Sequence, residues 1–211
     1  MKMRNCLYAV AGMSGAVLAL GCLVWAGGAM VLPELPSLEQ FSSRLAQKKV
    51  PPAPQEIDMT IVRRTSLQAK VKEQSLGLDV TVNRYFGGTF RFEGDLNAAG
   101  TQRRPESSFY GVDILGNGVN VSLWPVASDD YLLSGIYKKE GGKNKKGDSI
   151  HIWIHSFSRD FSIHDKGIDL DVIWKATGYR IQGTIDKNLY GKKEMAILGG
   201  ALAALTSDAD R

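Results

Sequence analysis

The sequence predicts an α+β protein with a mainly antiparallel β-sheet, meander or sandwich-like, and a C-terminal helix, preceded by one N-terminal transmembrane helix. Three observations lead to this class: an uncharged run at the N-terminus, short stretches in which apolar and polar residues alternate, and an Ala- and Leu-rich segment near residue 200. Closely spaced short strands favour an antiparallel sheet over alternating strand–helix units. The predicted segments are residues 1–6, 7–32, 33–56 and 57–211.

Residues 7–32 are predicted to be a transmembrane signal-anchor helix. The 26 residues from Leu7 to Leu32 carry no charge and would form a helix about 39 Å long, whereas a bilayer core needs about 20 residues. Lys2 and Arg4 precede the run, so the positive-inside rule keeps residues 1–6 in the cytoplasm. In a Gram-negative bacterium, the protein would cross the inner membrane once and expose residues 57–211 to the periplasm.

Two other fates of the N-terminus are considered. A cleaved signal peptide has a shorter apolar stretch and a small-residue exit, which Gly27-Gly28-Ala29 would supply. In that case the protein is secreted after cleavage. A lipoprotein would use Cys22, but Leu23–Leu32 remains apolar beyond it. The length of the run favours an uncleaved anchor.

Residues 33–56 are expected to form a short helix followed by a stalk. Ser37-Leu38-Glu39-Gln40 has the form of a capping box before a helix from Leu38 to Lys48. Pro51, Pro52 and Pro54 then stop the helix and favour a stiff, extended spacer.

From Ile57 onward the apolar period becomes two, as in strands with one buried face. Leu76–Val82 alternates in this way, and Gly116-Asn117-Gly118 predicts a hairpin turn between two strands. Another hairpin is expected from Tyr131–Lys139 and Ser149–Phe157, joined by a lysine-rich loop.

The hairpin from Ile168 to Asp186 also allows a prediction of register. If Thr177-Gly178 is the turn, Trp174 opposes Ile181, and both lie on the buried face. Asp171 and Gln182 then face water.

The segment from Met195 to Leu205 is predicted to be a helix. Ile197, Leu198, Ala201, Leu202 and Leu205 give it an apolar face, and eleven residues are too few to cross a bilayer. Gly199-Gly200 should weaken the helix by roughly 1 kcal/mol per glycine relative to Ala. We expect the apolar face to pack on the sheet.

Charge and cysteine content limit the possible partners. The chain has 26 basic and 22 acidic residues, so without Lys2 and Arg4 the net charge is only +2, which does not support nucleic-acid binding. Both cysteines, Cys6 and Cys22, lie in or beside the apolar run. The exported domain therefore has to fold without disulfides.

Candidate binding residues are Lys143, Lys145 and Lys146 in the lysine loop, and His151, Trp153 and His155 on the predicted strand. The lysines are interpreted as a solvated loop, with contact to acidic lipid heads or an acidic partner as the alternative. On a strand the two histidines lie about 13 Å apart, too far to share one metal ion easily. Trp153 on the wet face is the best single candidate for a partner contact.

No catalytic residues, metal site or cofactor are predicted. Asp169 and Asp171 share a strand face, but alternating acids are ordinary on the wet face of a strand, and no nucleophile elbow, phosphate loop or zinc pattern occurs. An enzyme is therefore not favoured. We expect a membrane-anchored, exported protein-interaction module of the bacterial cell envelope, acting in secretion, surface-machine assembly or toxin neutralisation. A periplasmic carrier of a lipid or other apolar ligand is the alternative, and a hydrolase is the third possibility.

Overall fold

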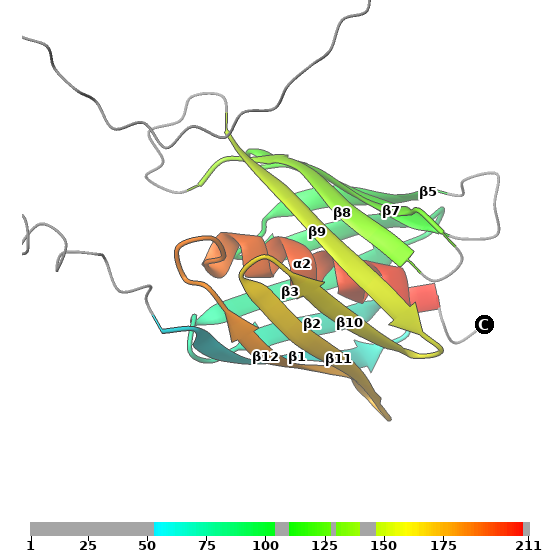
Figure 1. Ribbon diagram of the computed structural model, residues 1–211. Helices are drawn as coiled ribbons and strands as arrows, with labels where there is room; N and C mark the ends of the chain where they lie inside the picture. Colours follow the sequence, from blue (N-terminus) through cyan, green and yellow to red (C-terminus); the bar gives the residue numbers. More distant parts are fainter. Residues whose placement is uncertain (1–52, 104–109, 128–129, 140–146, 209–211) are drawn as a thin grey trace, which may run out of the picture. The chain divides into compact units, whose positions relative to one another are not determined.

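The computed structural model describes residues 53–103, 110–127, 130–139 and 147–208, which form a closed antiparallel barrel of twelve strands around a helix (Figure 1). Each strand pairs with its neighbours in sequence, and β1 pairs with β12 to close the barrel. The first six strands are β1 (Gln55–Thr65), β2 (Gln68–Glu73), β3 (Leu78–Tyr85), β4 (Thr89–Gly94), β5 (Ala98–Arg103) and β6 (Gly111–Gly116). The others are β7 (Val119–Pro125), β8 (Asp130–Tyr137), β9 (Asp148–Phe157), β10 (Asp160–Asp165), β11 (Ile168–Lys175) and β12 (Gly178–Ile185).

Helix α2 (Lys192–Leu205) follows the last strand and occupies the barrel interior, and a short 3₁₀ helix, η1 (Thr206–Asp208), follows it. Every residue of α2 from Glu194 to Leu205 is buried, and the helix contacts β1, β2, β3 and β6. The inward-facing residues of the strands are apolar and pack with α2 in a single core. This helix is apolar on all sides because the barrel surrounds it.

Two adjacent glycines let α2 approach the barrel wall. A Cβ atom on Gly199 would lie 2.7 Å from Cγ1 of Val71, and one on Gly200 would lie 2.9 Å from Cδ2 of Leu96. Both distances are shorter than van der Waals contact, so the glycines that lower helix propensity also permit the close packing.

The mainly antiparallel sheet and the C-terminal helix confirm the coarse prediction from sequence. The sheet is a meander, as one form of that prediction had it, but it closes on itself instead of forming a sandwich-like pair of sheets. The helix packs inside the closed sheet. Within the described ranges, no helix is long and apolar enough to span a bilayer. The predicted anchor at 7–32 and most of the predicted stalk lie outside these ranges.

The turn predicted at Gly116-Asn117-Gly118 is confirmed. Gly116 pairs with Val119, so Asn117 and Gly118 form a two-residue turn with φ of 48° and 71°. Positive φ at both central positions is typical of the type I′ turn that suits a twisted hairpin.

The register predicted for the β11–β12 hairpin is wrong by two residues. Trp174 pairs with Tyr179, and Val172 pairs with Ile181, so the turn consists of Ala176 and Thr177. A shift of two preserves the faces, and Val172 and Ile181 are buried as expected. Trp174 lies at the end of the strand, is 39% exposed and is not in the core.

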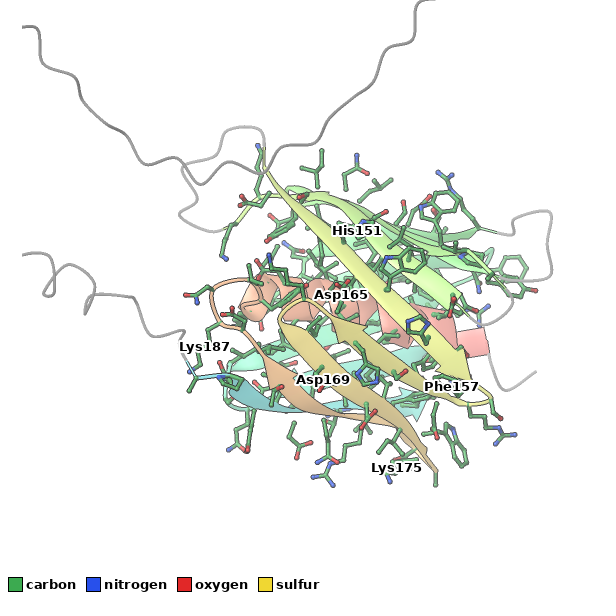
Figure 2. All side chains as sticks on the ribbon, in the orientation of Figure 1. His151, Phe157, Asp165, Asp169, Lys175 and Lys187 are labelled. Atoms are coloured by element: carbon green, nitrogen blue, oxygen red, sulfur yellow. The ribbon has the colours of Figure 1, made fainter. Side chains whose placement is uncertain are left out.

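The connectivity gives the barrel two different ends. The connections β1–β2, β3–β4, β5–β6, β7–β8, β9–β10 and β11–β12 lie at one end, where α2 also finishes. Figure 2 shows Phe157 and Lys175 at this end, and Asp165 and Lys187 at the other. The chain enters the barrel at the other end, where β1 begins.

Candidate functional site

Exposed apolar side chains gather at the end of the barrel where α2 finishes. Of the eleven large apolar residues that are exposed in the described part of the chain, seven lie in these connections or within two residues of them. We call this surface the aromatic end; its members are Leu67, Tyr85, Phe86, Trp124, Val126, Phe157 and Trp174. They come from five of the six connections and so surround the barrel mouth.

The side chains of the aromatic end reach far into solvent. Phe86, at the tip of β3–β4, is fully exposed, and Phe157, at β9–β10, is 65% exposed. Arginines stack on two of the rings: the guanidinium of Arg159 lies 5.0 Å from the centre of the Trp174 ring, and that of Arg103 lies 5.2 Å from Trp124. These cation–π contacts hold positive charge beside exposed aromatic surface.

The described residues of this end carry more positive than negative charge. Within two residues of the six connections lie five cations (Arg64, Arg84, Arg103, Arg159 and Lys175) and two carboxylates (Asp130 and Asp160).

A cleft of about 1120 Å³ opens within the aromatic end, between the connections β1–β2 and β3–β4. Arg63 and Arg84 line it and donate hydrogen bonds to the carbonyl oxygens of Thr206 and Ser207, the latter at 3.4 Å. Positive charge here is favourable because the carbonyls at a helix C-terminus carry partial negative charge. Gln102 also lines the cleft, and its buried Nε2 has no hydrogen-bond partner among the described residues.

The candidate residues on β9 lie together on the outer wall of the barrel. Ile150, Ile152 and Ile154 are buried, whereas His151 is exposed and Trp153 and His155 are half-buried, which confirms the predicted alternation. The His151 ring meets Trp153 edge-on, with 6.2 Å between ring centres, and Figure 2 shows His151 on the outer face. Lys143, Lys145 and Lys146 lie outside the described residues.

Strand pairing extends this surface beyond the residues predicted from sequence. Leu132 of β8 pairs with Trp153 on one side and with Trp124 of β7 on the other. We call Trp124, Leu132, Trp153 and His151 the wall patch. The sequence places each residue on a strand, but only the register between strands brings the three large side chains into one row.

The histidine–aspartate pairs do not form a catalytic arrangement. Nδ1 of His155 lies 2.6 Å from Oδ1 of Asp130, and Nδ1 of His164 lies 2.6 Å from Oδ1 of Asp169. Both pairs project from the outer wall, where the strand N–H groups are used in the ladder and are unavailable as an oxyanion hole. The cleft is lined by other residues, and the described residues hold no group of three potential metal ligands.

A buried ionic cluster lies at the opposite end, where α2 begins. Glu194 is 2% exposed, accepts a hydrogen bond from the Tyr137 hydroxyl and lies 3.3 Å from Nζ of Lys139. Its second oxygen accepts a hydrogen bond from Gly191 N–H at 2.9 Å. Burial acts to raise the pKa of Glu194, but the hydrogen bonds and Lys139 outweigh it and hold the pKa below its usual value. These contacts anchor the start of the helix.

Comparisons with protein-family models, with curated protein sequences and with solved structures found no match for this chain.

Proposed function

We propose that this chain is a membrane-anchored, exported protein-interaction module of the bacterial cell envelope, and that the wall patch contacts the protein partner. Residues 7–32 hold it in the inner membrane, and the barrel lies in the periplasm. The observation that carries the proposal is the row of Trp124, Leu132 and Trp153 across three adjacent strands. Tryptophan dominates the energetics of many protein interfaces because it buries a large area and offers a polar N–H.

The interior of the barrel supports interaction over carriage of an apolar ligand. A carrier would need space between the sheet and the helix, but this space is filled by side chains of α2, which are buried from Glu194 to Leu205. A hydrolase has less support, because the two histidine–aspartate pairs stand on the outer wall and away from the cleft.

The protein contact is tested by photocrosslinking in intact cells. A photoreactive residue at position 151 should capture one discrete protein, and Trp153→Ser should abolish this adduct without changing the melting temperature by more than a few degrees. The matched control position is Lys72, which is exposed on β2, six strands around the barrel from β8. Equal capture from positions 151 and 72, or no protein adduct from position 151, would exclude the wall patch as the contact.

The location is tested separately. Alkaline phosphatase fused after Arg211 should be active, and a carbonate wash should leave the fusion in the membrane. An inactive fusion would place the barrel in the cytoplasm, and a soluble product that starts near Ala29 or Met30 would show signal cleavage.

A further inference from the structure

We propose that the aromatic end docks on the surface of an anionic phospholipid bilayer. The aromatic end and the wall patch are different surfaces that share Trp124. Binding of the aromatic end to a bilayer does not require that the wall patch bind any particular protein. Three features carry the proposal: the distribution of the exposed apolar side chains around the barrel mouth, their chemical type and the accompanying charge.

The arrangement favours a planar partner. The connections lie around the mouth of a closed barrel, and exposed apolar residues occur at β1–β2, β3–β4, β7–β8, β9–β10 and β11–β12. A protein partner that fits one side of the barrel would leave the rest of this ring in water. A membrane surface across the barrel mouth can contact exposed side chains from several sides of the barrel.

The residue types are those of proteins that lie in a membrane interface. Tyr85, Trp124 and Trp174 combine an apolar ring with a polar group, a combination enriched where hydrocarbon meets headgroups. Phe86 and Phe157 are the most exposed members, at 105% and 65%, and can enter the boundary between headgroups and acyl chains.

The charge specifies an anionic surface. Five cations against two carboxylates flank the described connections. Arg159 lies over the Trp174 ring, and Arg103, which is also ion-paired with Asp113, lies over the Trp124 ring. Each Lys or Arg near an anionic leaflet contributes to binding, and the contribution falls within a Debye length. The cleft within the ring has room for a headgroup, and Arg63 and Arg84 line it.

The opposite end of the barrel has a different character and supplies the control. Leu115 and Leu189 are exposed there, at 48% and 43%. The charges described there are of both signs, and some are paired, as in Lys192 with Asp95 at 2.7 Å and Lys72 with Asp79 at 3.8 Å. Apolar exposure alone therefore does not distinguish the two ends, whereas its combination with an excess of positive charge among the described residues does.

The test uses the full-length protein in zwitterionic nanodiscs, so that residues 7–32 have lipid of their own. These particles are mixed with vesicles of phosphatidylcholine, or of phosphatidylglycerol and phosphatidylcholine, and bound protein is measured by flotation. We expect capture by the phosphatidylglycerol vesicles at low salt, and at least tenfold less by phosphatidylcholine alone or in high salt.

Two double variants assign the capture to the aromatic end. Phe86→Ser with Phe157→Ser should lower vesicle binding at least tenfold, whereas Leu115→Ser with Leu189→Ser should leave it unchanged. Arg64→Gln and Lys175→Gln should each lower it about fivefold. Because all these side chains are exposed, the near-UV circular dichroism should stay that of the native protein.

Three outcomes would overturn the proposal. The first is no capture by phosphatidylglycerol vesicles, and the second is equal capture by both lipid compositions. The third is an equal loss in the two double variants. If a photoreactive residue at position 86 captures a discrete protein while vesicles bind nothing, the aromatic end is a second protein-binding surface instead.

Discussion

Removal of one hydroxyl group, in Tyr137→Phe, should destabilise the barrel measurably at neutral pH. This hydroxyl is buried and donates a hydrogen bond to the Glu194 carboxylate. The same carboxylate lies 3.3 Å from Nζ of Lys139 and accepts a hydrogen bond from the Gly191 N–H. Tyr137 keeps its proton because burial and the Glu194 charge raise its pKa. A hydrogen bond to a buried charged group contributes about 1.5–3 kcal/mol, which is the loss we expect at pH 7.

The loss should shrink in acid. The folded-state pKa of Glu194 is held below its ordinary value of 4.5, mainly by the Tyr137 hydrogen bond acting against burial. A lowered pKa contributes stability that is complete above the unfolded value and is lost as the pH falls through the folded value. Once the pH has fallen through the lowered folded-state pKa and Glu194 is protonated, the difference between wild type and Tyr137→Phe should fall toward the roughly 0.5–1.5 kcal/mol of a neutral hydrogen bond.

The measurement is urea unfolding of the full-length protein, followed by near-UV circular dichroism at pH 7 and at a series of lower pH values. Tyr85→Phe is the matched control, because the Tyr85 side chain is half-exposed at the aromatic end, and it should change the free energy of unfolding by no more than about 0.5 kcal/mol. A pH-independent loss, or a loss at pH 7 no larger than that of the control, would refute the role of the Glu194 charge.

The remaining predictions concern the stability of the barrel. Gly183→Ala should cost several kcal/mol or prevent folding, because φ is +145° and the new Cβ would lie 2.0 Å from the Asp169 carbonyl oxygen. Gly77→Ala, at φ +60° with nothing within 4 Å, should cost only about 1–2 kcal/mol by the same urea assay. Trp174→Ala should lower the free energy of unfolding by about 1–2 kcal/mol, because the side chain is 39% exposed. A fully buried tryptophan would lose about 3–5 kcal/mol, so a loss above about 3 kcal/mol would show that Trp174 is buried. Asp171→Asn, on the exposed face, should stay within about 0.5 kcal/mol. Chelator and reductant should leave the melting curve unchanged, because the described residues contain no group of three metal ligands and both cysteines precede the barrel.

The local pattern of the sequence was sufficient to predict which way side chains face. Val80 and Val82 of β3, Ile152 of β9 and Val172 of β11 are buried as their alternation predicts. Each of these predictions uses only residues close together in sequence, since successive side chains in a strand point to opposite faces.

The register of the β11–β12 hairpin could not be predicted from the alternation of apolar and polar residues. A shift of two residues leaves every side chain on its face, so the alternation is equally satisfied by a turn at Thr177-Gly178 and by one at Ala176-Thr177. The observed register is compatible with closure of the barrel, in which Gly178 pairs with Val62 of β1, more than a hundred residues earlier. A Cβ on Gly178 would lie 1.9 Å from the carbonyl oxygen of Ile61, so glycine is required inside the strand and does not mark the turn.

The two candidate surfaces differ in how much of them could be predicted. Trp153 and His151 lie on one strand, so alternation alone placed them on the wet face. The aromatic end combines residues from Leu67 to Trp174 that no local pattern connects. They meet only because consecutive antiparallel strands return every second connection to the same end and because β1 pairs with β12.

Closure of the barrel also limits which of its surfaces can bind a partner. Each of the twelve strands pairs on both sides, so the described sheet has no open edge to which a partner could add a strand. The interior is occupied by α2. Recognition by the barrel therefore depends on side chains of the outer wall or of the two ends. Among these surfaces, the wall patch lies on one side of the barrel, where a protein partner could bind. The aromatic end surrounds the barrel mouth, where a flat surface could bind.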